Sequence, residues 1–391
     1  MTSTILGRTS DFYDVFSDVA GTDLAAWQRA HDYGAEVVPV INEHWEKYEF
    51  PLDLVRKLAD YDLLTDGLEV PGHETLSPLG AGLVTMETSR ADGSMSTVIA
   101  VQAGLAMRSI ANCGSEEQKQ EWLPKLASAE KLGAFALTEP DHGSDSVALE
   151  TTAQRTDDGW VINGQKRWIG NGAGGDISVV WARMDDGQVG GFLVPQDAPG
   201  YEAETIAGKL SLRSIPQALI TLTDVHVPDS ARLPNAQSFR DTAGVLTSTR
   251  VAVAWMALGH AIACYEAARE HVLDREQFGR PLAASQIIQL RLADMLGDIT
   301  GMALYCRRLA DLDAAGKLTP QQASLAKVQN TRKARKTAAD ARDMLGGSGI
   351  LLENHVVRHM ADLEALHTYE GTDTVQSLIV GKKITGIGAF K

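Results

Sequence analysis

Glu370 has the surroundings that most suggest chemistry in this sequence. It lies in "LHTYEGTDTV", between Tyr369 and Gly371 and just before a predicted helix. Thr372 is a typical helix cap, and Asp373 favours the positive end of the helix dipole. Glu370 is therefore predicted to occupy the turn that enters this helix. A carboxylate there can pair with the helix dipole at the surface or act as an acid or base, and the segment alone leaves both open.

Four further segments combine polar residues with glycine. They are "FALTEPDHGSD" (135–145), "NGQKRWIGN" (163–171), "DREQFGRPLAASQ" (274–286) and "DMLGGSGI" (343–350). Taken singly, each has a plain structural explanation: a polar turn, a strand with a core tryptophan, a helix end with its loop, and a glycine pair that ends a helix. Local pattern alone assigns none of them a function.

One glycine-rich segment imitates a nucleotide-binding motif. "GNGAGG", residues 170–175, satisfies the spacing G-x-G-x-x-G. A dinucleotide fingerprint needs a helix after these glycines, but the strand-like "DISVVWARM" follows. We therefore predict a hairpin loop here and no Rossmann domain.

The composition is that of an ordinary globular protein and argues against several partners. The chain has 391 residues, 44% of them hydrophobic and 22% charged, with a formal net charge of -15. This charge repels phosphate backbones, so we expect no nucleic-acid partner. No apolar run is long enough for a membrane span, and the first residues resemble neither a secretory nor a mitochondrial leader. We expect a cytoplasmic protein without a membrane partner.

The cysteines indicate neither disulfides nor a metal site. Cys113, Cys264 and Cys306 are odd in number and far apart, and no C-x-x-C is present. They are interpreted as small core residues in a reducing compartment. No metal ligand set is expected.

Hydrophobic periodicity divides the chain into three regions and predicts an α+β fold. Residues 1–130 have helical spacing, including a capping box at Ser115 and Gln118. Residues 131–238 alternate with a period of two, and Asp158-Gly159, Asn163-Gly164 and Asp186-Gly187 are turn signals, so an antiparallel barrel or sandwich is expected. Residues 239–391 contain three long helical segments and the closing helix, which make a four-helix bundle.

This order of regions, together with the four segments and the final "YEGT", resembles the acyl-CoA dehydrogenase family of flavoproteins over essentially the whole chain. The resemblance implies FAD as cofactor, an acyl-CoA substrate and a role in fatty acid metabolism. It also implies a homo-oligomer, usually a tetramer, because Arg275 and Gln286 match residues that reach a flavin held mainly by a neighbouring subunit. A guanidinium suits the flavin pyrophosphate because its planar fork binds phosphate oxygens in pairs.

The resemblance also implies which residues form the site. Trp168 matches a residue beside the isoalloxazine ring, and Ser144 matches one that touches both flavin and acyl-CoA. The cofactor residues implied are Phe135, Leu137, Thr138, Gly143, Ser144, Trp168, Ile169, Gly170, Arg275, Gln277, Phe278, Gln286, Asp343, Leu345, Gly346, Gly347, Thr372 and Asp373. The substrate residues implied are Ser96, Ser144, Arg250, Tyr369 and Gly371.

In this family Glu370 matches the catalytic base. Forming a 2,3-enoyl thioester requires removal of a proton beside the carbonyl and of a hydride from the next carbon. A dry pocket raises the pKa of the carboxyl, and donors at the carbonyl oxygen stabilise the developing enolate. One of these donors is the backbone N–H of the base itself. A turn at a helix start can present both groups to one thioester.

Two departures from the family narrow the substrate and the electron acceptor. Glutaryl-CoA dehydrogenases share "TYEGT" but carry an arginine and a serine where this chain has Ser96 and Thr97. Without that cation a buried distal carboxylate would be unpaired, so a short, uncharged acyl chain is expected. Trp255 could shorten the acyl pocket or belong to the core.

Gly170 is the second departure, because most relatives have threonine there, whose hydroxyl bonds the flavin near its reactive nitrogen. Glycine removes this partner and is expected to leave space for a small molecule. Two outcomes stay open: electrons leak to oxygen, or a backbone amide or a water takes over the missing bond and the reactivity is unchanged. "WIGN" resembles short-chain acyl-CoA oxidases of plant peroxisomes. The chain ends in "GAFK", without a peroxisomal tripeptide. Electron-transferring flavoprotein is therefore the expected acceptor.

Three alternatives remain beside the dehydrogenase. They are a decarboxylating glutaryl-CoA dehydrogenase, a short-chain acyl-CoA oxidase, and a DNA-binding alkylation-response flavoprotein of the same fold. The last would need a basic surface, and this chain has an excess of acid.

Overall fold

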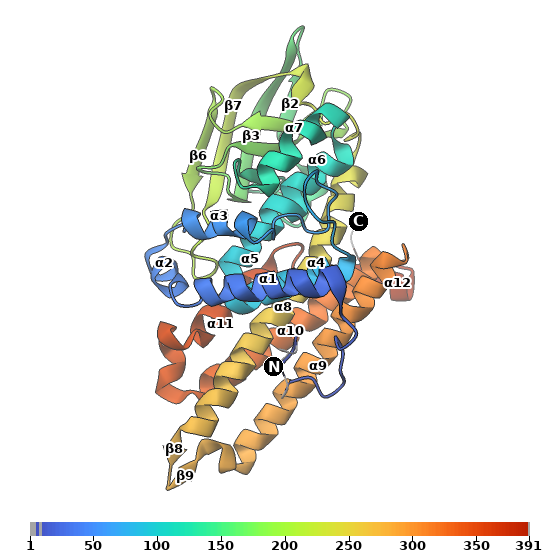
Figure 1. Ribbon diagram of the computed structural model, residues 1–391. Coiled ribbons are helices and arrows are strands. Elements are labelled where there is room, and N and C mark those ends of the chain that lie inside the picture. The colour runs from blue at the N-terminus through green and yellow to red at the C-terminus, as the bar shows by residue number, and fades with distance from the viewer. Residues whose placement is uncertain (1–4, 8–9, 390–391) are drawn as a thin grey trace.

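The computed structural model describes residues 5–7 and 10–389. Figure 1 shows helices, a β-sheet and a second group of helices. The first region is helical, as the apolar spacing predicts, and Ser115 and Gln118 form the expected capping box. Its helices are α1 (Gly21–Val37), α2 (Ile41–Lys47), α3 (Leu52–Asp60), α4 (Pro78–Ala91), α5 (Gly93–Ile99), the π-helical η1 (Ala100–Met107), α6 (Arg108–Cys113) and α7 (Glu116–Ala127).

The β region is a mixed sheet rather than the purely antiparallel one expected from the hairpin signals. Within the described residues seven strands form it, in the order β1-β4-β2-β3-β7-β6 with β5 paired to β4. β4 pairs in parallel with β1 and with β2, because the β2–β3 hairpin is inserted between β1 and β4. The strands are β1 (Gly133–Ala136), β2 (Thr152–Arg155), β3 (Gly159–Gly170), β4 (Ile177–Met184), β5 (Val189–Pro195), β6 (Tyr201–Thr205) and β7 (Gln217–Pro228).

Two of the three predicted turns are confirmed, and one is wrong. Asp158-Gly159 lies at the β2–β3 hairpin, and Asp186-Gly187 lies between β4 and β5. Asn163-Gly164 instead forms a bulge inside β3, where the register with β7 shifts. Gly164 has a φ of 147°, and a Cβ there would come within 2.5 Å of Thr151 Oγ1. Glycine is needed at this position for close packing inside a continuous strand.

The "GNGAGG" segment connects two strands but is not a hairpin loop, because β3 and β4 do not pair with each other. Strand β4 follows it where a dinucleotide-binding fold would have a helix. The rejection of a Rossmann domain is therefore confirmed, although the expected local geometry was wrong.

Between residues 239 and 389 the structure has five α-helices instead of four. The unexpected one is α11, which packs against both α8 and α10. The helices are α8 (Phe239–Asp274), α9 (Gln286–Ala314), α10 (Pro320–Met344), α11 (Val356–Thr368) and α12 (Asp373–Thr385), with a hairpin of β8 (Glu276–Gln277) and β9 (Arg280–Pro281) between α8 and α9. Short 3-10 turns cover 146–148, 229–231, 282–284, 346–350 and 352–354.

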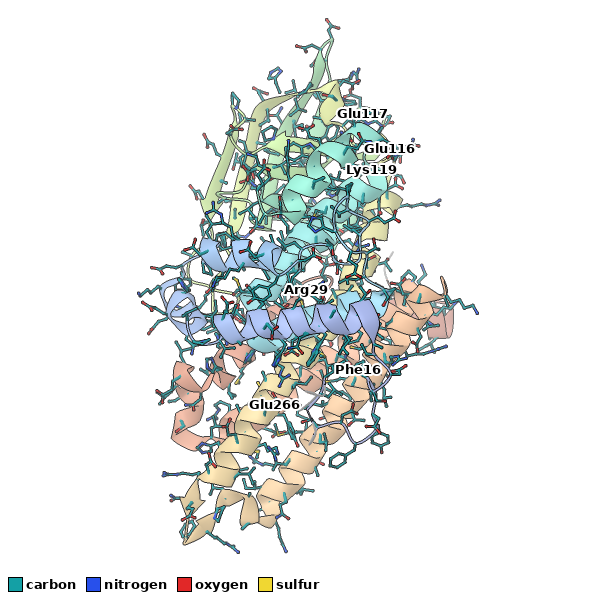
Figure 2. All side chains as sticks on the ribbon, viewed as in Figure 1. Phe16, Arg29, Glu116, Glu117, Lys119 and Glu266 are labelled. Carbon is teal, nitrogen blue, oxygen red and sulfur yellow. The ribbon has the colours of Figure 1, made fainter. Side chains whose placement is uncertain are left out.

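Helix α8 is the central packing element. A Cβ at Gly259 would lie 2.1 Å from Met86 O, so α4 and α8 approach closely there. Arg90 of α4 pairs with Glu266, which Figure 2 labels on α8. By length and composition α8 could cross a membrane, but most of its apolar stretch is buried inside the protein, as expected for a core helix.

Candidate active site

Glu370 lies in a short turn between α11 and α12, as predicted from the sequence. Glu370 and Gly371 have φ values of 54° and 83°, so two consecutive residues adopt the left-handed conformation. This is uncommon for glutamate and is a feature of functional turns. The hydroxyl of Thr372 accepts a hydrogen bond from Val375 N–H at 3.2 Å and caps α12. Local capping and the glycine together turn Glu370 out of the helical path.

The Glu370 carboxylate faces α8. Thr249 Oγ1 donates a hydrogen bond to Glu370 Oε2 at 2.5 Å. The residue is half-buried, and burial raises the pKa of its carboxyl, whereas the Thr249 bond and the charges of Arg250 and Lys327 oppose this rise. A carboxyl whose pKa is moved towards neutrality suits a general base. Among the described residues we find no acceptor bonded to Glu370 N–H.

The π-helical segment η1 connects Gly170 with the surroundings of Glu370. A Cβ at Gly170 would lie 2.8 Å from Val101 Cγ2, and one at Gly104 would lie 3.6 Å from Thr249 Cγ2. Single π-helical turns often occur at functional sites. The expectation that Gly170 leaves an open space is wrong, because the Val101 side chain occupies it.

The "FALTEPDHGSD" and "NGQKRWIGN" segments lie side by side. Arg167 N–H donates to Thr138 O at 2.8 Å, and the Lys166 ammonium donates to Leu137 O at 3.0 Å and to Glu139 Oε1 at 2.9 Å. Although burial opposes it, the Lys166 charge and backbone bonds lower the pKa of Glu139 to about 2, and burial lowers that of Lys166 to about 8. This buried ion pair fixes the loop to β3.

Trp168 projects from the sheet. Its φ is 65°, the β3–β7 register breaks beside it, and half of its surface is exposed. An exposed tryptophan in a strained strand position suits stacking against a planar ring. Ile169 and Gly170 beside it are buried, as are Phe135 and Leu137, whereas Gly143 and Ser144 are exposed in the neighbouring loop.

The expected substrate residues divide into two groups. Tyr369 packs against both helical cores, its hydroxyl lies 3.3 Å from Met256 Sδ, and Arg250 is one residue from Thr249 on α8. The Ser96 and Thr97 hydroxyls donate to Gly93 O at 3.1 and 2.7 Å. No contact in the described residues joins Ser144 to this group.

Trp255 belongs to the core. It is 1% exposed, and its ring lies 5.8 Å from that of Phe16 between ring centroids. Its indole also touches Gly82. Of the two roles that the sequence left open, the structure supports packing, and nothing places this ring at the Glu370 turn.

Several expected cofactor residues lie far from Trp168. Figure 1 places the β8–β9 hairpin, which carries Gln277, at the end of the bundle remote from the sheet. Arg275, Gln277, Phe278 and Gln286 are all exposed there. The chain therefore does not bring these four residues together with Trp168. They could contact the same kind of cofactor only in another copy of the protein.

The remaining expected cofactor residues have structural partners. Asp343 pairs with Arg291 and Arg342, and Asp373 pairs with Arg332. Leu345 is buried, whereas Gly346 and Gly347 have no heavy atom within 4 Å of a built Cβ. The glycine pair thus leaves an open surface that a ligand can approach.

Four residues at the site were missed by sequence reasoning: Thr249, Val101, Lys327 and Gln376. Lys327 and Gln376 are fully buried on α10 and α12. The available signal was a polar residue on the face of each helix that packs inward. Nothing in the sequence pointed to Val101.

Comparisons with known proteins agree with this architecture. Models of the N-terminal, middle and C-terminal domains of acyl-CoA dehydrogenases match residues 24–130, 134–225 and 239–385. An acyl-CoA dehydrogenase of Bacillus subtilis (strain 168) is 33% identical over 90% of this chain and 94% of its own. The mitochondrial short-chain specific acyl-CoA dehydrogenase of Homo sapiens is 32% identical over 88% and 85%.

Solved structures also match over nearly the whole chain. Two structures of glutaryl-CoA dehydrogenase from Mycobacterium smegmatis superpose with TM-scores of 0.94 and 0.95 at 39% and 35% identity. They cover 98% and 100% of this chain, and 99% and 100% of their own, and the second is in complex with FADH2. A chain from the electron transferring flavoprotein of Acidaminococcus fermentans has a TM-score of 0.89 at 27% identity, over 94% of this chain and 99% of its own.

The fold and site thus define a flavin-dependent oxidoreductase. The chain belongs to the acyl-CoA dehydrogenase family. It is an acyl-CoA dehydrogenase that uses FAD and acts on an acyl-CoA in fatty acid metabolism. Its own residues fit the cofactor, since Trp168 offers an exposed ring beside the Thr138 loop and the glycine pair leaves backbone open.

Proposed function

We propose that this enzyme oxidises a short, uncharged acyl-CoA to its 2-enoyl-CoA, with Glu370 as the base. The observation that carries this proposal is the half-buried carboxylate in a left-handed turn, with a raised pKa and a backbone N–H beside it that bonds no acceptor in the described part of the chain. The similarity to short-chain specific acyl-CoA dehydrogenases supports the substrate length.

In the proposed reaction the substrate thioester lies against the Glu370 turn. A Glu370 Oε atom takes the proton from the carbon beside the carbonyl, and Glu370 N–H donates to the thioester oxygen as charge develops there. The chemistry that FAD would supply is acceptance of the hydride from the next carbon, so that a C=C bond would form while the proton goes to Glu370. Tyr369 lines the pocket, and Arg250 favours the ionised carboxylate.

Glutaryl-CoA is the competing substrate, because two of the matched structures carry that name. Against it stand the hydroxyls of Ser96 and Thr97, which hydrogen-bond Gly93 O at the positions where the resemblance implies an arginine and a serine in glutaryl-CoA dehydrogenases. A hydroxyl already bonded to a carbonyl cannot replace a cation opposite a distal carboxylate.

Replacing Glu370 by glutamine tests the base. The variant keeps the size of the side chain but cannot take a proton, so turnover should fall by about 10²–10⁴ while flavin content and acyl-CoA binding stay near wild type. Single-turnover bleaching of the flavin by butyryl-CoA is the measurement. Turnover within threefold of wild type would falsify the assignment.

A substrate panel tests the chain length and charge. We expect kcat/KM for butyryl-CoA to exceed those for isobutyryl-, octanoyl- and glutaryl-CoA. If glutaryl-CoA leads, or releases carbon dioxide, the charge argument fails. If octanoyl-CoA leads, only the short pocket is rejected.

We also propose that electron-transferring flavoprotein accepts the electrons and that the enzyme works in the cytoplasm. The match to a chain from a structure of such a flavoprotein supports this acceptor.

We further propose that the working form is a homo-oligomer, with four subunits expected. Exposed apolar side chains at Phe278, Ile287 and Leu290 support the homo-oligomer, because they cluster on the end of the bundle remote from the sheet. Analytical ultracentrifugation of the holoenzyme tests it, and a monomer at micromolar concentration would exclude it.

A further inference from the structure

The turn that carries Glu370 is held by side chains at each of its three backbone carbonyls. The Lys327 ammonium donates to Tyr369 O at 2.6 Å and also to Gly371 O. Gln376 Nε2 donates to Glu370 O at 2.8 Å. Two consecutive left-handed residues form no regular hydrogen-bond ladder, so these bonds replace it.

Helix α10 supplies this support from two positions on one face. Ser324 and Lys327 are three residues apart and both are fully buried. Ser324 Oγ donates to Gln376 Oε1 at 2.6 Å, which orients the Gln376 amide towards Glu370 O. Glycine suits position 371 because its φ is 83°, and a Cβ there would lie 2.1 Å from Gln376 Nε2 and displace the amide that holds Glu370 O.

Lys327 differs from the other two supporting side chains because it carries charge. The charged groups that face Glu370 are Arg250 from α8 and Lys327 from α10. Around Lys327 lie Asp373 of α12 and His367 of α11, whose pKa burial lowers, and the Tyr369 hydroxyl, whose pKa burial raises, is also close to Glu370. Burial lowers the pKa of Lys327 to about 8, whereas Glu370 and Asp373 favour its cation. An ammonium has three donors, and two of them bond the turn. At neutral pH the base therefore has a buried cation behind its own backbone.

We propose that Lys327 is a positioning residue for the base, whose ammonium fixes the turn of residues 369–371 and keeps the Glu370 carboxylate ionised before proton abstraction. This inference rests on the proposed role of Glu370. A neutral side chain could hold the carbonyls by hydrogen bonds alone. The charge of Lys327 is required only to keep Glu370 ionised. Fixing the turn and keeping Glu370 ionised therefore predict different pH dependence.

Lys327→Met, Lys327→Gln and Lys327→Arg separate the two parts in the holoenzyme. Without the cation the carboxyl ionises less readily, so kcat/KM for butyryl-CoA should fall more at pH 6.5 than at pH 9, where the wild-type lysine is itself largely neutral. We expect the loss to be about tenfold larger at the lower pH in the methionine and glutamine variants. Lys327→Arg should restore the wild-type shape of the pH profile, even at a reduced rate.

Two matched controls lie on the same helix. Lys333→Met removes a cation that pairs with Asp298 at 2.7 Å and does not touch the turn, so its kcat/KM should stay within about twofold of wild type at each pH. Ser324→Ala removes the Gln376 contact without a charge, so its loss should be equal at both pH values. Flavin absorbance and thermal unfolding verify that each variant is folded. If Lys327→Met does not fold, Lys327→Gln and Lys327→Arg provide the test.

The outcomes distinguish this inference from the proposed function. If Lys327→Met and Lys327→Gln lose activity equally at both pH values, the role of the Lys327 charge in keeping Glu370 ionised is overturned. If neither variant loses activity at either pH, the role of Lys327 in fixing the turn is overturned as well. If Glu370→Gln, measured alongside, keeps its turnover, the base assignment fails instead. An inactive Glu370→Gln together with a pH-dependent loss in Lys327→Met supports both.

Discussion

Gly170 illustrates how one neighbouring side chain changes the meaning of a residue. A glycine in place of threonine removes a hydroxyl, but Val101 fills the space that a larger side chain would need. Any effect of this position on oxygen must therefore come from the missing hydrogen bond and not from a void. A smaller residue in place of Val101 would make room for threonine at position 170. The effect of the missing hydroxyl on the reaction with oxygen can therefore be tested.

We predict that Gly170→Thr alone is poorly tolerated, whereas Gly170→Thr combined with Val101→Ala folds and reacts more slowly with oxygen than wild type. The restored hydroxyl is the physical reason. Each protein is reduced anaerobically with substrate and exposed to air, and peroxide is followed. Val101→Ala alone is the control for added space. Equal peroxide rates in the double variant and wild type would show that the hydroxyl does not control oxygen reactivity, and peroxide at the full catalytic rate would favour an oxidase.

At the scale of elements, the crossing of α4 and α8 sets the frame on which Thr249 and Arg250 stand. Gly259 allows it, because a Cβ there would meet a backbone oxygen that cannot move without its helix. Overpacking of this kind costs about 1–3 kcal/mol. The same helix carries Gly244, which is exposed and has no heavy atom within 4 Å of a built Cβ.

The two glycines form a matched pair for one experiment. Gly259→Ala should lower the Tm of the holoenzyme and reduce turnover, because α8 must shift away from α4. Gly244→Ala should keep or raise the Tm, since alanine favours a helix by about 0.5–1 kcal/mol over glycine. Differential scanning calorimetry measures both. A similar Tm in the two variants would mean that the helix crossing tolerates a methyl group.

At the scale of the whole molecule, a buried polar cluster joins the three regions. Asp362 Oδ1 of α11 accepts hydrogen bonds from Trp45 Nε1 of α2 at 3.1 Å and from Leu212 N–H of the β region at 2.6 Å. Arg358 and Asp92 form a buried ion pair next to it. Burial and then the charge of Asp92 raise the pKa of Asp362 to about 7, although Arg358 opposes this.

The raised pKa predicts how stability depends on pH. A carboxyl with a higher pKa in the folded protein than in the unfolded chain binds its proton more tightly when folded, so its stabilising contribution is complete below the unfolded pKa, near 4, and disappears as pH rises to about 7. His260, His359 and Lys209 also face the cluster, and burial lowers the pKa of each. The histidines are therefore neutral throughout this range.

We expect the Tm of Asp362→Asn to decrease less than that of wild type when the pH is raised from 5 to 8. The amide oxygen can accept the same two hydrogen bonds but carries no charge to desolvate. Tm values of the holoenzyme at pH 5, 6.5 and 8 provide the measurement, and the exposed Asp32→Asn is the control. Parallel Tm curves for wild type and Asp362→Asn would contradict this assignment.

The sequence by itself determined the features that depend on neighbours along the chain. Apolar spacing determined the helical, β and helical regions, and Thr372 with Gly371 determined the turn at Glu370, because caps and left-handed residues act within a few positions. The motifs also pointed to the family. Even local signals had limits, since Asn163-Gly164 is typical of a hairpin but is a bulge here, where the approach of Thr151 decides.

Only the tertiary structure decided which residues surround the base. Thr249 and Glu370 are 121 positions apart, and Lys327 reaches the turn from another helix. It also placed the β8–β9 hairpin, which carries Gln277, at the end of the bundle remote from the sheet that carries Trp168, and it placed Val101 against Gly170. Such contacts arise from how helices and sheet pack across the core, and no local pattern of residues encodes that packing. The side chains that adjust the charge of Glu370 therefore become visible only in the folded chain.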